Sequence, residues 1–197
     1  REKALTLLPN TYILYKPHEM ELFKKEYSPS KMYLLKKNIQ QKKGIHITNN
    51  MDDIMKGYQN NFKVVQEYVK HTYLIDGHKV NLGIYLLIIC RHGKLKAYVH
   101  SIGKCIYTKK KYKGNFKSID PEEHLTSVGL DVNMYNTMPE TLEDLRVRIG
   151  KSQYDLLLNR IHRNLLYVVT AAEHKLCQLI NIRNNLSFQL FGLDYNF

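Results

Sequence analysis

The first part of the chain carries short apolar segments separated by turn residues, a pattern that predicts β-strands. Strands are expected at residues 32–35, 45–48, 63–68, 84–90, 96–100 and 104–108, and a last strand at residues 188–191. The segment 84–90 is almost continuously apolar and β-favouring, as in strands that are buried on both faces. Turn residues separate it from the next two strands, which predicts an antiparallel meander.

Helical spacing of apolar positions marks other segments of the chain. Two short helices are expected at residues 19–26 and 51–58. A long helix is expected after Ser152, because Ser152 and Asp155 have the spacing of a capping box and an apolar stripe continues from there to Leu179. Helices and antiparallel strands are therefore segregated along the chain, which is typical of the α+β class.

Three segments are expected to be loops. Residues 7–14 contain Pro9 and predict a short loop. Residues 36–44 are basic and join two predicted strands, so they predict the tip of a hairpin. Residues 109–117 are basic, contain glycine and predict a mobile loop.

The charge of the chain favours negatively charged partners. It carries 30 Lys and Arg against 18 Asp and Glu, a net charge of +12, which favours nucleic acid, a membrane surface or an acidic peptide as partner. The same charge also fits a Lys-, Asn-, Ile- and Tyr-rich chain from an AT-rich genome. The sequence contains no zinc finger, helix-turn-helix or RNP-like aromatic motif, which argues against nucleic acid.

Neither a membrane segment nor a metal-binding cysteine motif is visible. The longest apolar run, residues 82–90, is interrupted by Gly83 and is too short to cross a bilayer. Cys90, Cys105 and Cys177 lie far apart and have no zinc-ligand spacing, so buried free thiols in a reducing intracellular compartment are expected. Because residue 1 is Arg rather than Met, the chain is expected to be a fragment of a longer protein.

Six motifs in the chain resemble the tubulin tyrosine ligase-like family. One is a two-part signature: residues 64–69 read VVQEYV and residues 74–85 read LIDGHKVNLGIY, which resemble the V-Q-x-Y-I strand and the LIDGRKFDLR segment of that family. The others follow in the family's order: LPNTY at residues 8–12, YLLK at 33–36, GI at 44–45, HLTS at 124–127 and FQLFGLD at 188–194.

The resemblance implies an ATP-grasp fold, in which two α+β lobes clamp ATP and magnesium between antiparallel sheets. Residues 1–63 would form the central lobe with its lysine-bearing hairpin, and residues 64–197 the C-terminal lobe. The implied activity joins glutamate, glycine or tyrosine to an acidic protein tail, such as the tubulin C-terminus, through an acyl-phosphate. It also implies a cytoplasmic or microtubule-associated protein. Phosphoryl transfer needs cations around the triphosphate and carboxylates on the metal.

The resemblance also assigns roles to individual residues. Lys36 would contact the ATP phosphates, although a solvated hairpin tip is the alternative interpretation for it and the preferred one for its lysine neighbours. Asp194 would hold magnesium, Thr126 would lie at the acceptor or amino-acid site, and two further metal ligands would follow beyond residue 197. The remaining nucleotide contacts would come from Gln66, Glu67, Tyr68, Val69, Lys79 and Asn81.

Four positions depart from the family pattern. Asn81 replaces an Asp, Gly83 and Ile106 each replace an Arg, and Ser127 replaces an Asn. Compensation by Lys104, by Arg91 or by the lysines at residues 109–111 would be needed to restore the lost charge. Two hypotheses therefore stay open: an ATP-dependent ligase, or a catalytically inactive ATP-grasp module with a binding or structural role in a larger assembly.

Overall fold

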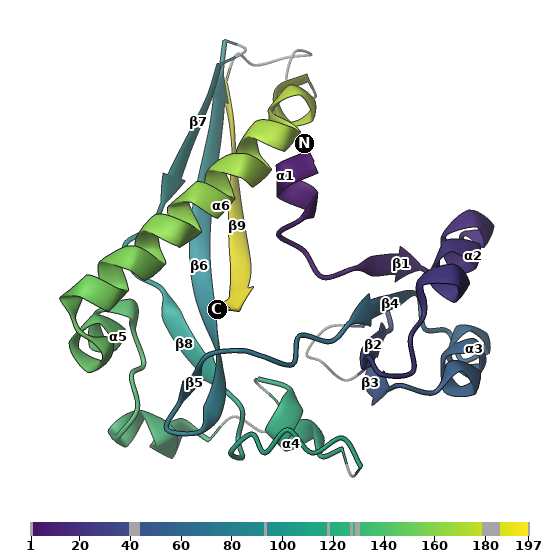
Figure 1. Cartoon of the computed structure of the whole chain (residues 1–197). Helices are drawn as coiled ribbons and strands as arrows, with labels where there is room; N and C mark the ends of the chain where they lie inside the picture. Colours follow the sequence, from purple (N-terminus) through teal and green to yellow (C-terminus); the bar gives the residue numbers. More distant parts are fainter. Residues whose placement is uncertain are drawn as a thin grey trace.

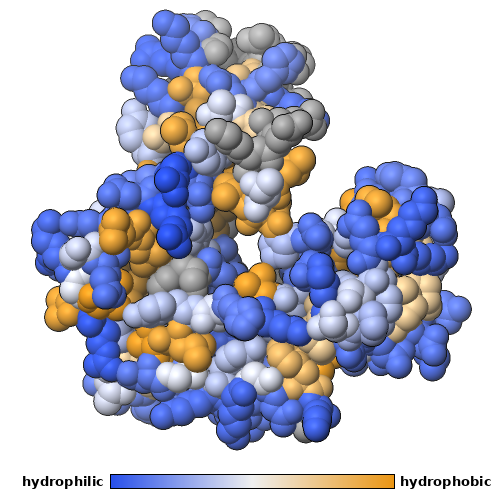
Figure 2. All heavy atoms as spheres, viewed as in Figure 1, coloured by the Kyte–Doolittle hydropathy of each residue, from blue (hydrophilic) through white to orange (hydrophobic). Residues whose placement is uncertain are grey.

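The computed structural model of the chain describes residues 2–39, 44–92, 94–117, 119–126, 128, 131–178 and 186–196. Figure 1 shows two antiparallel sheets, each with helices on its outer side. The first sheet and its helices lie to one side of the picture, and the long strand β6 with its neighbours forms the other lobe. In the space-filling view, the surface is hollowed between the two lobes (Figure 2). The α+β class expected from the sequence is confirmed.

The first sheet has four strands in the order β1-β4-β2-β3, and all of its pairs are antiparallel. The strands are β1 (Thr11–Ile13), β2 (Tyr33–Lys36), β3 (Ile45–Thr48) and β4 (Val64–Glu67). The expected division at residue 64 would have placed β4 in the second lobe, but β4 lies between β1 and β2 in the first sheet. The chain passes from one sheet to the other only after β4.

Helices α2 (Pro17–Glu26) and α3 (Met51–Gln59) pack on the side of this sheet that faces away from β6 (Figure 1). Phe23 of α2 is fully buried, and its ring meets those of Tyr12 and Tyr33 edge-on with centroids 5.3 Å away in each case. This aromatic packing closes the core of the first lobe.

The second sheet is built around β6 (His78–Arg91), and each of its other strands pairs with β6. The partners are β5 (Leu74–Ile75), β7 (Lys94–Val99), β8 (Lys104–Tyr107) and β9 (Leu186–Asn196). The predicted meander was wrong, because β8 pairs with β6 and not with β7. The reason is the length of β6: it starts six residues before the expected position 84, and this extra stretch provides the partner for β8.

Helices α5 (Leu142–Ile149) and α6 (Lys151–Gln178) cover one face of this sheet, and α6 crosses it diagonally (Figure 1). The capping box lies at Thr141 and Asp144 of α5 and not at Ser152. Gly150 ends α5 with a φ of 82°, and the N–H of Tyr154 donates to its carbonyl, so Ser152 is already inside the first turn of α6. The remaining elements are short: α1 (Glu2–Leu5), α4 (Pro121–His124) and η1 (Val132–Asn136). In the described part of the chain, no helix combines the length and apolar character that crossing a membrane requires.

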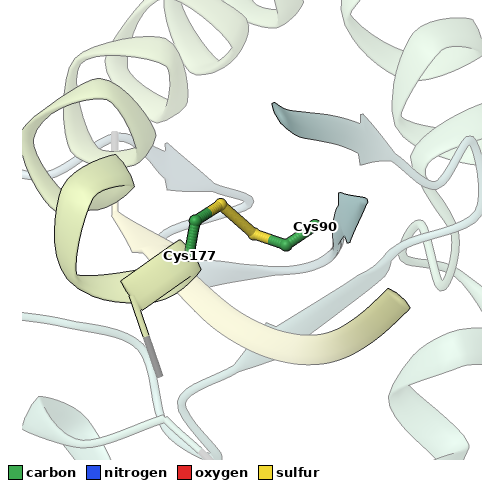
Figure 3. The surroundings of a disulfide bond; sticks show 2 residues. All are labelled: Cys90 and Cys177. Carbon is green, nitrogen blue, oxygen red and sulfur yellow. A yellow bond between two sulfur atoms is a disulfide. The ribbon is translucent and has the colours of Figure 1, made fainter. Parts of the chain in front are cut away.

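Cys90 and Cys177 form a disulfide that joins the end of β6 to the last turns of α6 (Figure 3). The expectation of three free thiols was therefore wrong for two of them, and Cys105 is the buried free cysteine. Cys90 faces α6, and the helix returns over the sheet far enough to bring the two Cα atoms within 5.8 Å. The 87-residue separation gave no sign of this pairing, and the cysteines no longer support a reducing compartment.

Candidate functional site

A cavity of about 340 Å³ lies between the two sheets, and we call it the cleft. Elements from both lobes line it: β2, β3, β4 and the segment after β4, together with β6, α4 and β9. The structure brings together in its wall all nine site residues expected from the sequence: Lys36, Gln66, Glu67, Tyr68, Val69, Lys79, Asn81, Thr126 and Asp194. Their individual roles stay predictions, but their convergence on one cavity is a finding.

Lys36 lies at the end of β2, in the wall of the cleft and not on a solvated tip. Its Nζ donates to Oε1 of Gln66 over 2.7 Å, and Nε2 of Gln66 in turn donates to Oγ1 of Thr11. Burial lowers the pKa of the Lys36 ammonium from its usual value. Lys36 has no ion pair with any carboxylate in the described chain, so its charge is available to an anion in the cleft. Lys42 and Lys43 lie outside the described residues.

The segment after β4 forms one wall of the cleft, but part of its backbone is already used. The N–H of Glu67 donates to the carbonyl of Asn10, and the N–H of Tyr68 donates to the carbonyl of Met32, each over 2.8 Å. These two donors hold the segment against the first sheet. The N–H groups of Glu67 and Tyr68 are therefore not available to a ligand in the cleft.

Lys79 is a buried lysine, with 7% of its surface exposed. Its Nζ donates to the hydroxyl of Tyr68 over 2.8 Å and to the carbonyl of Val69 over 3.3 Å. The same ammonium lies 4.4 Å from the ring centroid of Tyr68 and 4.8 Å from that of Tyr112. Burial lowers the pKa of Lys79 to about 8. No carboxylate among the described residues pairs with it, although buried cations are normally paired.

The hydroxyl of Tyr68 connects Lys79 to α4. It lies 2.9 Å from Nδ1 of His124. Because the Tyr68 oxygen accepts from the Lys79 ammonium, its own proton is best directed to Nδ1, which requires a neutral imidazole. Burial lowers the pKa of His124, in agreement with that neutral form. Of the two groups that contact the Tyr68 hydroxyl, Lys79 is therefore the cation and His124 is neutral.

Asn81 and Asp194 lie on neighbouring strands. The register pairs Asn81 with Asn196 and Gly83 with Asp194 across β6 and β9, and Asn81, Asp194 and Asn196 all line the cleft. Among the described residues, no three His, Cys, Asp or Glu side chains are grouped to hold a metal. Mg²⁺ commonly binds one or two protein oxygens together with substrate phosphates. The oxygens of Asp194 and Asn196 fit that limited role.

Three of the four departures from the family pattern, at residues 81, 83 and 106, lie next to one another on β6 and β8. Asn81 is opposite Ile106 across β6 and β8, and a Cβ atom at Gly83 would lie 3.9 Å from Cδ1 of Ile106. Lys104 is the nearby cation, and its Nζ lies 3.9 Å from Oε1 of Glu140.

The other cations proposed to compensate are placed less favourably. Arg91 is at the opposite end of β6 from Asn81, and Lys109 and Lys110 pair with carboxylates of the α4 region. Ser127 lies outside the described residues.

Several lining residues were not found from the sequence. His124 lies in the HLTS motif but was not assigned a role, and Asn196 follows Asp194 at the two-residue spacing that puts strand side chains on one face. Thr72 has a buried hydroxyl without a hydrogen-bond partner in the described chain, and no sequence pattern marks it. Apolar walls come from Leu34, Ile45 and Leu125.

The class of protein follows from this arrangement. Two antiparallel α+β lobes with a cleft between them, lined by Lys36 of the first lobe and by Lys79 and Asp194 of the second, define an ATP-grasp protein. The family model described as "Tubulin-tyrosine ligase family" matches residues 1–197, and the chain belongs to that family.

Curated relatives agree with this assignment. A "Probable beta-tubulin polyglutamylase" of Tetrahymena thermophila is 28% identical over 214 residues, which cover 94% of this chain and 17% of the relative. "Tubulin polyglutamylase ttll-5" of Caenorhabditis elegans is 32% identical over 107 residues, which cover 53% of this chain and 14% of the relative. The chain thus spans less than a fifth of the length of these two relatives.

Proposed function

We propose that the cleft binds ATP and that the protein uses it to join an amino acid to an acidic protein tail. The observation that carries this proposal is the convergence of Lys36, Lys79 and Asp194 on one cavity, in which neither ammonium has a carboxylate partner among the described residues. Two partly desolvated cations without a counter-ion favour a polyanionic ligand. The names of the relatives favour glutamate over glycine and tyrosine, and tubulin as the protein that carries the tail.

The proposed reaction has two steps. A carboxylate oxygen of the tail attacks the γ-phosphorus of ATP, forms an acyl phosphate and releases ADP. The amine nitrogen of the incoming amino acid then attacks the acyl carbon, expels inorganic phosphate and loses a proton to give the amide. Lys36 and Lys79 would neutralise phosphate charge that builds up in the first step. Asp194 and Asn196 would hold magnesium, which when bound polarises the phosphates.

The basic surface suits such a substrate. A net charge of +12 would attract a glutamate-rich tail over distances up to about one Debye length, roughly 8 Å at physiological ionic strength. A cytoplasmic or microtubule-associated location belongs to the same proposal.

The test is ATP binding and amino-acid incorporation by the full-length protein. We expect labelled glutamate to enter tubulin, and Lys36→Ala and Asp194→Ala each to lower turnover by about 100-fold or more, the usual cost of removing one positioned charge. Lys24→Ala is the matched control, because Lys24 is exposed on α2 and pairs with Glu21. Full activity of either cleft variant would contradict the assignment.

A second function is supported by a specific observation. Asn81, Gly83 and Ile106 leave a region beside the cleft without the charges that the family pattern has there. The alternative is therefore an inactive ATP-grasp module that binds nucleotide without transfer. In the same assay, ATP binding without incorporation of glutamate, glycine or tyrosine would favour this alternative.

A further inference from the structure

The loop at residues 109–117 is tied to the rest of the second lobe. Three of its lysines form ion pairs with the α4 region: Lys109 with Glu122 at 3.0 Å, Lys110 with Asp120 at 2.7 Å, and Lys113 with Glu123 at 3.5 Å. The expectation of a mobile loop did not include these contacts. They give the loop a defined path past the cleft.

Tyr112 is the aromatic residue of this loop that reaches Lys79. Its N–H donates to the carbonyl of Gly77 over 2.8 Å, and its hydroxyl donates to the carbonyl of Lys70 over 3.3 Å. These bonds fix Tyr112 at both ends, between the turn before β6 and the segment after β4. Its ring is consequently held 4.8 Å from the Lys79 ammonium, which also lies 4.4 Å from the ring centroid of Tyr68.

We propose that Tyr112 is a positioning residue: its ring holds the Lys79 ammonium in the wall of the cleft and so strengthens the binding of the anionic part of a nucleotide. A lysine side chain has four rotatable bonds. Fixing the side chain before the ligand arrives lowers the entropy lost when an anion binds. The ring face stabilises the ammonium without neutralising it, as a carboxylate would. The charge of Lys79 therefore stays available to the ligand.

The groups around Lys79 support this role. Tyr68 and Val69 supply the two hydrogen-bond acceptors, His124 lies behind Tyr68, and Asp194 lines the same cleft from β9. Burial lowers the pKa of Lys79 to about 8, so the protonated form that binds anions is lost as the pH rises through that region.

This inference rests on nucleotide binding in the cleft, so ATP affinity of the full-length protein is measured first, by calorimetry. Tyr112→Ala should weaken ATP binding by about 10-fold, or about 1.4 kcal/mol, which is the order of the entropy cost of ordering a lysine side chain. Tyr112→Phe keeps the ring and should stay within about 2-fold of the wild type. Tyr98→Ala is the matched control, because Tyr98 is half exposed on β7 and does not line the cleft.

The pH dependence of ATP affinity separates positioning from a general loss of structure. In the wild type, affinity should fall as the pH rises above about 8. In Tyr112→Ala, water reaches Lys79, its pKa moves back toward the usual value, and the fall should occur at higher pH.

An unchanged affinity and pH profile in Tyr112→Ala would overturn the inference, and so would equal losses in Tyr112→Phe and Tyr112→Ala with an unchanged profile. A wild-type protein that does not bind ATP would instead contradict the proposed function.

Discussion

At the scale of single residues, the second lobe depends on one close approach between backbone segments. Gly103 is buried just before β8, and a Cβ atom built on it would lie 2.6 Å from the carbonyl oxygen of Gly83 and 2.8 Å from Cδ1 of Leu142. A backbone carbonyl inside a sheet cannot move away as a flexible side chain can. Gly103 therefore lets the chain reach β6 and α5 at the same point.

Gly103→Ala should lower the free energy of unfolding by about 2 kcal/mol, as expected for overpacking of a buried site. Gly192→Ala is the control, because no atom of the described residues, its chain neighbours aside, lies within 4 Å of a Cβ atom built on Gly192. This change should stay within about 0.5 kcal/mol. Both substitutions restrict the unfolded chain similarly, so the difference between them isolates the contact. Urea unfolding of both variants measures it, and equal stability would contradict the expected clash.

Matching the chain to the motifs of the family predicted which residues line the cleft, because each motif marks positions by their place in the sequence and does not depend on how the sheets are arranged. Lys36 and Asp194 were both expected at one site, and both line the cleft although they lie in different sheets. The contact between Tyr112 and Lys79 could not be predicted, because Tyr112 belongs to a loop that carries no motif and that ion pairs hold in place. Thr72 also lines the cleft and was not predicted, because it belongs to none of the motifs.

At the scale of elements, the junction of α5 and α6 shows how local signals compete. Thr141 Oγ1 accepts from the N–H of Asp144 over 3.1 Å, and the Asp144 carboxylate accepts from the N–H of Thr141 over 2.9 Å. The cap stabilises α5, which the apolar pattern had not revealed, and the similar spacing at Ser152 is only the first turn of α6.

Thr141→Ala should therefore destabilise the protein by about 1 kcal/mol, the usual value for losing an N-cap. Ser152→Ala, at an exposed position inside α6, should change stability by less than about 0.5 kcal/mol. Thermal unfolding of the two variants compares them directly. A larger loss in Ser152→Ala would restore the assignment made from sequence.

Most strands were predicted within a few residues, because apolar spacing is a local property. Residues 45–48 agree with β3, and residues 104–108 agree with β8 to within one residue. Strand order was not predicted correctly, because it depends on partners far away in the sequence. The early part of β6 alternates polar and apolar residues, and it was not recognised as a strand that could pair with β8.

At the scale of the whole molecule, the disulfide joins the far end of the central strand to the end of the longest helix. A crosslink that closes a loop of this size restricts the unfolded chain, and its stabilisation grows slowly with loop length. It acts on the second lobe, where α6 packs on β6.

Chemical reduction should lower the free energy of unfolding by about 4 kcal/mol, as expected for a loop closed across 87 residues. The double variant Cys90→Ala/Cys177→Ala should not respond to reductant, which separates the bond from other effects of the reagent. Denaturant unfolding with and without reductant gives the difference. An unchanged midpoint in the wild type would show that the bond adds no stability.

The central position of β6 has a consequence for how the protein folds. Its longest partner, β9, pairs Asp194 with Gly83, two residues separated by more than half of the chain, so almost all of the 197 residues must be made before that contact can form. Pairings between such distant segments are slow, and until they form β6 presents an open edge that invites association with other chains. The cleft is therefore expected to form late, when the strand that carries its proposed metal-binding carboxylate pairs with β6.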